Sequence, residues 1–363
     1  MICRYNITPQ SPVITPFMSD TFFGHFCWAL RYQKGESFLE NFLNTYGDGK
    51  AAPVLFSSAF PLGYLPRPTL PPPDRDTMRN FVREHFGESR QDIFQGLSRV
   101  KKWNKQQFIP LDLWAELRDD YTAVRLYEHF FKKEAASDDE KDIPDGGRHF
   151  VEDVTTSNRI SRLQGTVQEG GLFEREKRWY YEKIFLDKQP PELPARNVSE
   201  KRWRYERVTL DLYAEINDPA MGGLVDQFLL EFLPHYGFGA DKSVGMGSLD
   251  IWKAKSLSPE CLSDQDCNAR MSLSLASFSG IEAYDAFYSL KTKFGRLGGH
   301  FAFSSPTGGN PRPFKKPVLM YEPGAVFFCD HSLSSKPLLD KVHSDERIRH
   351  CGIPITLPFK TLN

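Results

Sequence analysis

The segment from Asp218 to Trp252 constrains the fold more than any other part of the sequence, because it reads helix, glycine-rich loop and strand in that order. Asp218 suits a helix N-cap, Pro219 suits the first helical position, and apolar residues recur at helical spacing until Gly237. The next residues, "GFGADKSVGMG", form a loop, and "SLDIW" alternates like a strand. The phosphate-binding loops of nucleotide-binding proteins need the reverse order, with a strand before the loop and a helix after it.

The loop also departs from these templates in detail. A Walker loop has a glycine before its lysine, whereas Asp241 precedes Lys242 here, and a dinucleotide fingerprint would need its third glycine at position 242. A glycine-rich loop still exposes backbone N–H groups, and Lys242 and Ser243 add a charge and a hydroxyl that suit a phosphate chain. A long turn with solvated polar residues explains the same letters equally well.

Composition narrows the class of protein. The 363 residues are 40% hydrophobic and 13% aromatic, which is enough for the cores of two domains. The formal net charge is -1, so nucleic-acid binding would have to come from local basic patches. Only Cys261 and Cys267 are close among the six cysteines, and their spacing fits no zinc or redox motif. We expect free thiols, no metal, no leader or membrane span, and a cytoplasmic protein.

The order of expected elements favours an α+β fold. A first strand is followed by a helix with Ser19 or Asp20 as its N-cap, and then by two short strands, a long insertion, a hairpin, a long strand and the helix–loop–strand segment. Strand, helix, two strands, helix and strand make the βαββαβ plan of ferredoxin-like and RNA-recognition domains. The predicted parts are an N-terminal domain 1–255 (helical insertion 74–145, hairpin 150–186, strand 202–218, glycine-rich loop 237–247) and a β-rich second domain 256–363.

Seven segments, in order along nearly the whole chain, resemble one family. They are "SDTFFGHFCWAL", "YLPRPTLPPP", "TSNRISRLQGTVQEGGLFEREKRWYY", "GFGADKSVGMG", "YSLKTKFGRLGGHFAF", "PFKKPVLMYEPGAVF" and "CGIPITLPF". Together they look like the RAMP-superfamily subunit of type III-A CRISPR effectors, the Csm-complex member of the Cas-five-like group.

The resemblance implies a non-catalytic subunit with two ferredoxin-like (RRM-like) RAMP domains and no cofactor. Such a subunit caps the repeat-derived 5′ handle of the CRISPR RNA. It contacts the large polymerase-like Cas-ten-type subunit and the adjacent backbone RAMP subunit, and its β-hairpin thumb enters the duplex of guide and target RNA. The insertion 74–145 is longer than the resemblance requires, and its role stays open.

The expected RNA-binding residues fall into three segments, together with Ser19 at the start of the first helix. The glycine-rich loop would cradle handle phosphates, and basic residues interleaved with aromatic ones after position 290 would bind single-stranded RNA, although the phenylalanines there suit a core better. Arg159 and Arg162 cannot share one strand face, so we expect one of them to bind RNA and the other to pair with a carboxylate. The three sets are Gly237, Gly239, Lys242, Ser243, Gly245 and Gly247 in the loop; Asn158, Arg159 and Arg162 in the hairpin; and Lys291, Arg296, Lys315 and Lys316 in the basic segment. Lys293 and Arg312 belong to the same basic segment, which stands almost without acidic neighbours in sequence.

The far arm of the hairpin carries Leu172 and Phe173 beside two glycines. Apolar side chains near an exposed tip can wedge against a base step and unstack it. Packing on the hairpin's own base or on a neighbouring subunit explains them equally well.

Two other functions remain open from the sequence. Some RAMP relatives cleave precursor RNA with a histidine, and His25 in the first helix would be the general acid or base, although its aromatic neighbours favour a packed or capping role. The second alternative is the equivalent subunit of a type III-B complex. The hairpin and the "KTKFGRLGG" segment favour type III-A by resemblance.

Overall fold

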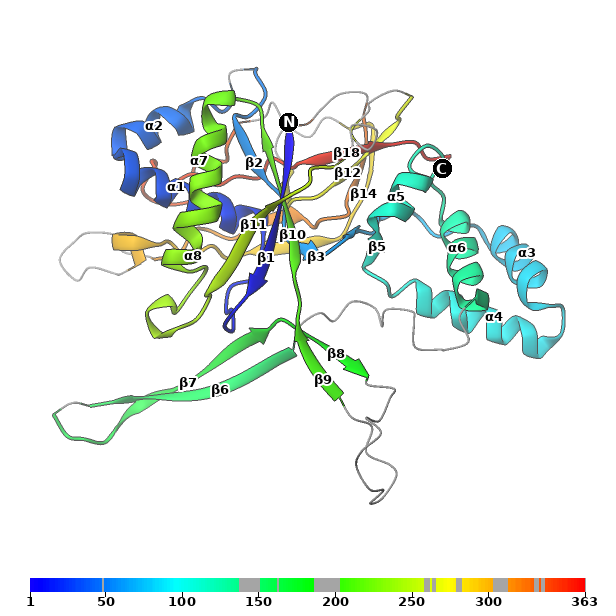
Figure 1. Cartoon of the computed structure of the whole chain (residues 1–363), viewed down its shortest axis with the longest axis horizontal. Coiled ribbons are helices and arrows are strands. Elements are labelled where there is room, and N and C mark those ends of the chain that lie inside the picture. Colours follow the sequence, from blue (N-terminus) through cyan, green and yellow to red (C-terminus); the bar gives the residue numbers. More distant parts are fainter. Residues whose placement is uncertain are drawn as a thin grey trace, which may run out of the picture.

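The computed structural model describes residues 1–47, 49–136, 151–161, 163–185, 203–257, 262, 266–278, 283–302, 313–329, 333 and 337–362. Within these ranges the chain forms several small antiparallel sheets with helices beside them, so the predicted α+β class is confirmed. Figure 1 shows a central body, a helical lobe on one side of it, and two hairpins that project from it.

The first sheet combines strands from both ends of the first 254 residues. Across the sheet the order is β11 (Leu249–Ala254), β1 (Ile2–Pro9), β10 (Leu210–Ile216) and β2 (Val54–Phe56), and β3 (Phe60–Pro61) also pairs with β10. All pairings are antiparallel. Along the chain, strand, helix, strand, strand, helix and strand follow one another in this half, with the insertion between the second and third strands.

The expected strand 202–218 is wrong as a single element. It divides into β9 (Trp203–Arg207) and β10, and β9 pairs with β8 (Tyr181–Phe185) in a separate two-stranded sheet. Six of the seven side chains of β10 are buried, so this strand is covered on both faces. Alternating hydrophobicity is typical of a strand with one exposed face, so this pattern does not predict the bounds of a strand that is buried on both faces.

Four helices accompany the first sheet. They are α1 (Ser19–Lys34), α2 (Glu36–Asn44), α7 (Gly222–Gln227) and α8 (Leu233–Tyr236), with a π-helical turn, Phe228–Phe232, joining the last two. Aromatic rings pack the helices against the sheet. The ring centroid of Phe26 in α1 lies 5.5 Å from that of Phe56 in β2 and 5.2 Å from that of Phe228. As the sequence predicts, the Asp218 side chain accepts a hydrogen bond from the Ala220 N–H and the last helix stops at Gly237.

The N-cap predicted for α1 is wrong. The helix begins at Ser19 itself, and Met18 stands at the N-cap position without a side-chain hydrogen bond. The two expected caps are used in tertiary contacts instead. The Ser19 Oγ accepts a hydrogen bond from the Leu275 N–H at 2.9 Å, and the Asp20 carboxylate forms an ion pair with Lys293 at 3.0 Å.

The described residues after 256 form two more antiparallel sheets. One has the order β14 (Asp285–Phe287), β17 (Val326–Phe328), β12 (Ala269–Ser272) and β18 (Thr356–Phe359). The other has the order β13, β16, β15, namely Ala276–Ser277, Val318–Tyr321 and Leu290–Lys293. The described part of this half contains a 3₁₀ turn at Gly299–Ala302 and no α-helix. A second ferredoxin-like domain therefore stays a prediction, as does the boundary at residue 255.

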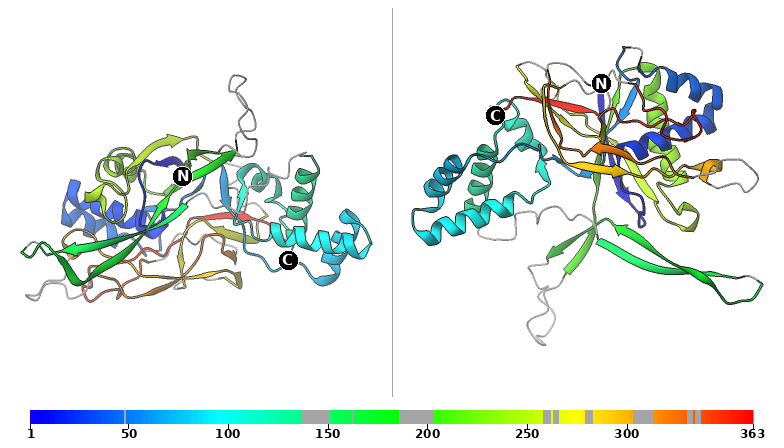
Figure 2. Two further views of the ribbon diagram at one scale, coloured as in Figure 1. Left: turned by 90° about the horizontal axis from the view of Figure 1, so that it is seen from below. Right: turned by 180° about the vertical axis from the view of Figure 1, so that it is seen from behind.

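The helical insertion is a lobe on the opposite side of the body from the tip of the long hairpin (Figures 1 and 2). A short sheet of β4 (Tyr64–Pro66) and β5 (Phe108–Pro110) stands at its base. Its helices are α3 (Arg75–Phe86), α4 (Arg90–Trp103), α5 (Leu111–Leu117) and α6 (Ala123–Ala136). The acidic end of the predicted insertion, 137–145, lies outside the described residues.

The long hairpin pairs β6 (Val151–Ile160) with β7 (Val167–Trp179) within the predicted span 150–186. Because β6 ends at Ile160 and β7 begins at Val167, most of the "QGTVQEGG" stretch that the sequence places at the tip lies in β7. Backbone hydrogen bonds between Val13 and Arg178, both 2.9 Å, fix the base of the hairpin to the body.

Candidate nucleic-acid interface

The glycine-rich loop 237–247 between α8 and β11 folds back on itself. The Phe238 N–H donates to the Gly247 carbonyl at 2.8 Å, and the Gly247 N–H donates to the Pro12 carbonyl at 2.9 Å. A Cβ atom at Gly247 would stand 1.9 Å from the Phe238 carbonyl oxygen, and its φ of +72° is strained for any residue with a side chain. Close approach of two backbones therefore requires glycine at this position.

Most N–H groups of this loop are used inside the protein, which corrects the expectation that the loop exposes them. Besides those of Phe238 and Gly247, the Ala240 N–H donates to Thr15 Oγ1 at 3.2 Å, and the N–H groups of Gly237, Val244, Gly245 and Met246 donate to carbonyls of the same helix end and loop. In this fully described loop, three successive N–H groups have no partner, those of residues 241, 242 and 243. Successive free N–H groups form a small site for an anion.

His25 of α1 holds the loop from below. Its Nε2 accepts a hydrogen bond from the Gly239 N–H at 3.0 Å, which requires the neutral ring with its proton on Nδ1. Burial, and to a smaller extent the charge of Lys242, lower the pKa of His25 to about 3. A ring that is neutral and already bonded to the backbone is a structural support.

Lys242 and Ser243 lie at the exposed outer turn of the loop. Partial burial lowers the pKa of Lys242, and this side chain has no ion-pair partner in the described part of the chain. The neighbouring Asp241 pairs with Arg175 of the hairpin at 2.8 Å. The guanidinium of Arg175 also stands 4.8 Å from the ring of Phe173. One arginine therefore links the hairpin to the loop and neutralises the carboxylate beside Lys242.

The segment after residue 290 is less free of acidic partners than its sequence suggests. Lys291 lies 3.7 Å from Glu322, and Lys293 pairs with Asp20 of α1 at 3.0 Å. These carboxylates are distant in sequence, so local composition could not reveal them. The ion pair at Lys291 is half-exposed and of small energetic value, and a phosphate could compete for this lysine.

The remaining cations of the segment differ in exposure. Arg296 and Lys316 are exposed and have no ion-pair partner in the ranges that the structure describes, and Arg296 stands 5.9 Å from the ring of Phe314. Lys315 points inward and donates to the Arg349 carbonyl at 2.7 Å, and burial lowers its pKa. Lys315 is therefore a structural residue here, and Arg312 lies outside the described residues.

Helix α1 brings the glycine-rich loop and this basic segment together. His25 supports the loop, and three residues further along the helix Trp28 packs against two glycines of the basic segment. Cβ atoms at Gly298 and Gly299 would stand 2.7 Å from Trp28 Nε1 and 2.4 Å from Trp28 Cη2. Figure 1 shows the 3₁₀ turn of the segment and the loop between α8 and β11 on the same side of the body, above the hairpin, and both views of Figure 2 agree.

The predicted wedge residues of the hairpin, Leu172 and Phe173, lie within strand β7 and not in the turn. Leu172 is 68% exposed and pairs across the strands with Asn158, and Phe173 pairs with Ser157 and is half-buried beneath Arg175. The Arg159 side chain and all of Arg162 lie outside the described residues, so their predicted RNA contacts stay predictions.

Ser19 is buried, with its hydroxyl engaged by the Leu275 N–H and its own N–H donating to Ser58 Oγ at 3.3 Å. Its hydroxyl is not presented to a ligand, so the structure gives no support to Ser19 as an RNA-binding residue. Among the described residues no helix is long and apolar enough to cross a membrane, and no group of three metal-ligating side chains is present.

Comparison with solved structures shows that the chain has a known fold. The chain is similar to a chain of the crystal structure of the Csm1–Csm4 cassette in complex with cA4, with a TM-score of 0.50, 13% identity and coverage of 100% of both chains. The chain has the fold of that Csm1–Csm4 cassette subunit. The resemblance inferred from the seven sequence segments is thereby confirmed at the level of the fold.

Other comparisons are weaker. A chain of the Csm1–Csm4 cassette with AMPPNP gives a TM-score of 0.46 at 14% identity, with 100% of both chains covered. A chain of the type III-B Cmr-beta complex bound to cognate target RNA and AMPPnP gives 0.34 at 12% identity, covering 90% of this chain and 86% of that one. No family model and no curated protein matches the sequence.

Sequence reasoning missed two residues that position the glycine-rich loop. Thr15 and Arg175 both bond to the glycine-rich loop from distant segments. Thr15 carries no sequence signal. Arg175 carries a weak one, because it follows Phe173 by two residues in a strand and so shares its face.

Proposed function

We propose that this chain is a non-catalytic, RNA-binding subunit of a type III-A CRISPR effector complex and holds the repeat-derived 5′ handle of the CRISPR RNA. The observation that carries the proposal is the junction at α1, where His25 holds the glycine-rich loop and Trp28 holds the basic segment. Two segments that each suit a phosphate chain thus share one side of a fold that is similar to the Csm1–Csm4 cassette chain.

The phosphates of the handle would follow the unpaired cations of this side. Lys242 with the free N–H groups of residues 241–243 would hold one phosphate, and Arg296 and Lys316 would hold others. Partial desolvation already weakens the hydration of Lys242, as its lowered pKa indicates, so an approaching phosphate restores a favourable partner to its charge.

The finer assignments of fold and partners belong to the same proposal. The first sheet would be a ferredoxin-like RAMP domain, since its strands stand in the order fourth, first, third and second. The hairpin would be the thumb that enters the duplex of guide and target RNA, with Leu172 as an exposed wedge. The partners would be the large polymerase-like subunit of the complex and the adjacent backbone subunit.

The absence of RNA cleavage belongs to the proposal as well. A general acid or base needs a pKa near the working pH and a nitrogen within reach of the substrate. The pKa of His25 is about 3, and its Nε2 is bonded to Gly239. We therefore expect no precursor-processing activity that depends on His25.

The test is a binding and cleavage assay of the full chain, alone and with its large subunit, on RNA that carries the 5′ handle or a scrambled handle. We expect selective binding of the handle RNA without cleavage. Lys242→Ala and Arg296→Ala should each weaken binding by about 1–3 kcal/mol, as expected for charge-assisted hydrogen bonds. Lys102→Ala, which removes an exposed lysine from the helical lobe, is the matched control and should leave binding unchanged.

The assay also separates the roles of loop and hairpin. Leu172→Ala should leave handle binding intact and change only the engagement of target RNA. Equal losses for Lys242→Ala, Arg296→Ala and Leu172→Ala would contradict this division. Cleavage of handle RNA that disappears in His25→Ala would replace the proposal with a processing nuclease.

A further inference from the structure

A row of aromatic rings lies between the two segments assigned to phosphate binding. It runs from Phe301 to Trp28, whose ring centroids are 6.4 Å apart, on to Tyr32 at 5.5 Å from Trp28, and then to Tyr236 at 6.5 Å from Tyr32. The row therefore begins in the basic segment, crosses the outer side of α1, and ends at the last residue of α8, directly before the glycine-rich loop.

The two tyrosines of this row are open to solvent. Tyr32 is 61% exposed and Tyr236 is 52% exposed, and their ring planes differ by 14°. Buried Phe232 supports both from below, with its ring 4.2 Å from Tyr236 and 6.4 Å from Tyr32, nearly parallel to each. Because a buried ring fixes their orientation, the two exposed rings are ordered before any ligand arrives.

The tyrosine rings suit a base better than a phosphate, because a base has a flat face that stacks on an aromatic ring and a phosphate has none. Both tyrosines stand in the last turn of a helix, and in α1 the partial negative charge of that end is offset by Lys34 and by Arg31, which pairs with Glu36 at 2.9 Å. The cation nearest to this site is Lys242. Its aliphatic side chain packs beside Gly237, the residue after Tyr236, and a Cβ atom added to Gly237 would lie 3.4 Å from it. Aromatic rings beside a cation suit a base with its neighbouring phosphate, and sites that bind single-stranded nucleic acids combine base stacking with a positively charged groove in the same way.

We propose that Tyr32 and Tyr236 form a stacking platform for one unpaired base of the bound RNA, whose flanking phosphate lies at Lys242. The inference rests on the proposed function and adds to it a base-binding site made of residues outside both phosphate-binding segments. Because stacking does not depend on the hydrogen-bonding groups of the base, the platform should bind any base and should lose affinity only for an abasic nucleotide.

The experiment is a double-mutant cycle between the full-length protein and handle RNA with a single abasic nucleotide at each position in turn. In wild-type protein one position should weaken binding by roughly ten-fold when its base is removed, the order expected for one base–aromatic stack. In Tyr32→Ala/Tyr236→Ala, binding of intact RNA should fall by a similar factor, and the abasic nucleotide at that position should cost nothing further.

Two controls keep the cycle specific. Tyr32→Phe/Tyr236→Phe keeps the rings and should bind like wild type. Phe94→Ala removes an aromatic ring that is 74% exposed on α4 in the helical lobe, and it should leave the abasic profile unchanged.

Each other outcome overturns the inference in a distinguishable way. If handle RNA binds and the tyrosine variant shows the wild-type abasic profile, the platform is wrong and the proposed function stands. If the variant keeps its RNA affinity and loses association with the large subunit, the tyrosines belong to a protein interface. If wild-type protein binds no handle RNA, the proposed function and the platform both fail.

Discussion

At the scale of single residues, we expect alanine substitutions at two glycines of the same loop to lower the free energy of unfolding by different amounts. Both Gly245 and Gly247 have positive φ, +85° and +72°, so alanine at either should cost about 1–2 kcal/mol of backbone strain. Only at Gly247 would the new Cβ also collide with the Phe238 carbonyl, whereas the space around Gly245 is open. Urea unfolding should therefore show a loss for Gly247→Ala that is at least about 1–3 kcal/mol larger than for Gly245→Ala. Equal losses would contradict the close approach.

A histidine makes the second prediction at this scale. The unfolded chain protonates His25 near its usual pKa of 6.5, but the folded chain does so only near 3, so protons favour unfolding between these values. The stabilisation is complete above pH 6.5 and is lost as the pH falls toward 3. His25→Gln keeps an acceptor for the Gly239 N–H and removes the titration.

In urea unfolding between pH 6 and pH 4, this variant should show a shallower fall of the free energy of unfolding, by up to about 1.4 kcal/mol per pH unit. Buried His350, whose pKa is also about 3, stays in both proteins, so the difference isolates His25. Parallel curves would mean that His25 is protonated normally in the folded chain.

At the scale of elements, the ion pair between hairpin and loop predicts a rescue. Arg175→Ala would leave the Asp241 carboxylate unneutralised beside the phosphate site at Lys242, and handle RNA should bind several-fold more weakly, in the range of a partly exposed charge interaction of up to about 1 kcal/mol. Arg175→Ala/Asp241→Asn removes both charges and should restore most of the affinity. Filter binding at low salt would measure this, and a double variant as weak as Arg175→Ala would show that the arginine itself touches RNA.

The elements also show how far sequence could lead. The helix–loop–strand segment is predictable because Asp218, Pro219 and Gly237 act through local backbone chemistry that their letters reveal. Partners such as Glu322 for Lys291 and Asp20 for Lys293 are not, because they depend on how distant strands meet. For the same reason the loop sequence does not reveal that three of its N–H groups, those of Gly239, Ala240 and Gly247, donate to distant segments of the fold.

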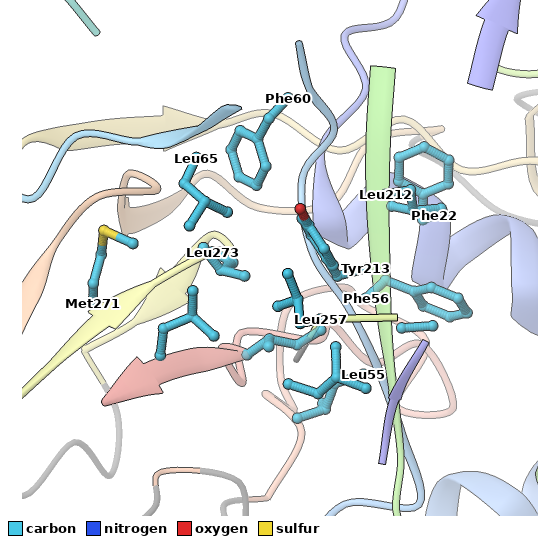
Figure 3. Close-up of a cluster of buried hydrophobic side chains, with 14 of the residues drawn as sticks. Phe22, Leu55, Phe56, Phe60, Leu65, Leu212, Tyr213, Leu257, Met271 and Leu273 are labelled. Carbon is cyan, nitrogen blue, oxygen red and sulfur yellow. The ribbon is translucent and has the colours of Figure 1, made fainter. Parts of the chain in front are cut away.

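At the scale of the whole molecule, the two halves share one hydrophobic core. Figure 3 shows side chains from β2 and β10 of the first sheet together with Met271 and Leu273 of the C-terminal half, and all belong to one buried cluster. Buried serines join the halves as well. The Ser274 Oγ donates to the Phe56 carbonyl at 2.9 Å and accepts from the Ile355 N–H at 3.0 Å. An apolar core with hydrogen bonds across it cannot be divided without exposing both kinds of group to water.

This shared core predicts that the two halves unfold together. Ser274→Ala would deprive one buried carbonyl and one buried N–H of the same partner, and it should lower the free energy of unfolding by about 1–3 kcal/mol. Because both halves meet at this residue, tryptophan fluorescence and circular dichroism should shift together to a lower urea midpoint, in one transition. Ser98→Ala on the exposed side of α4 is the control and should change the midpoint little. Two separated transitions, with only one moved by Ser274→Ala, would mean that each half is stable alone and that the shared core contributes little to either.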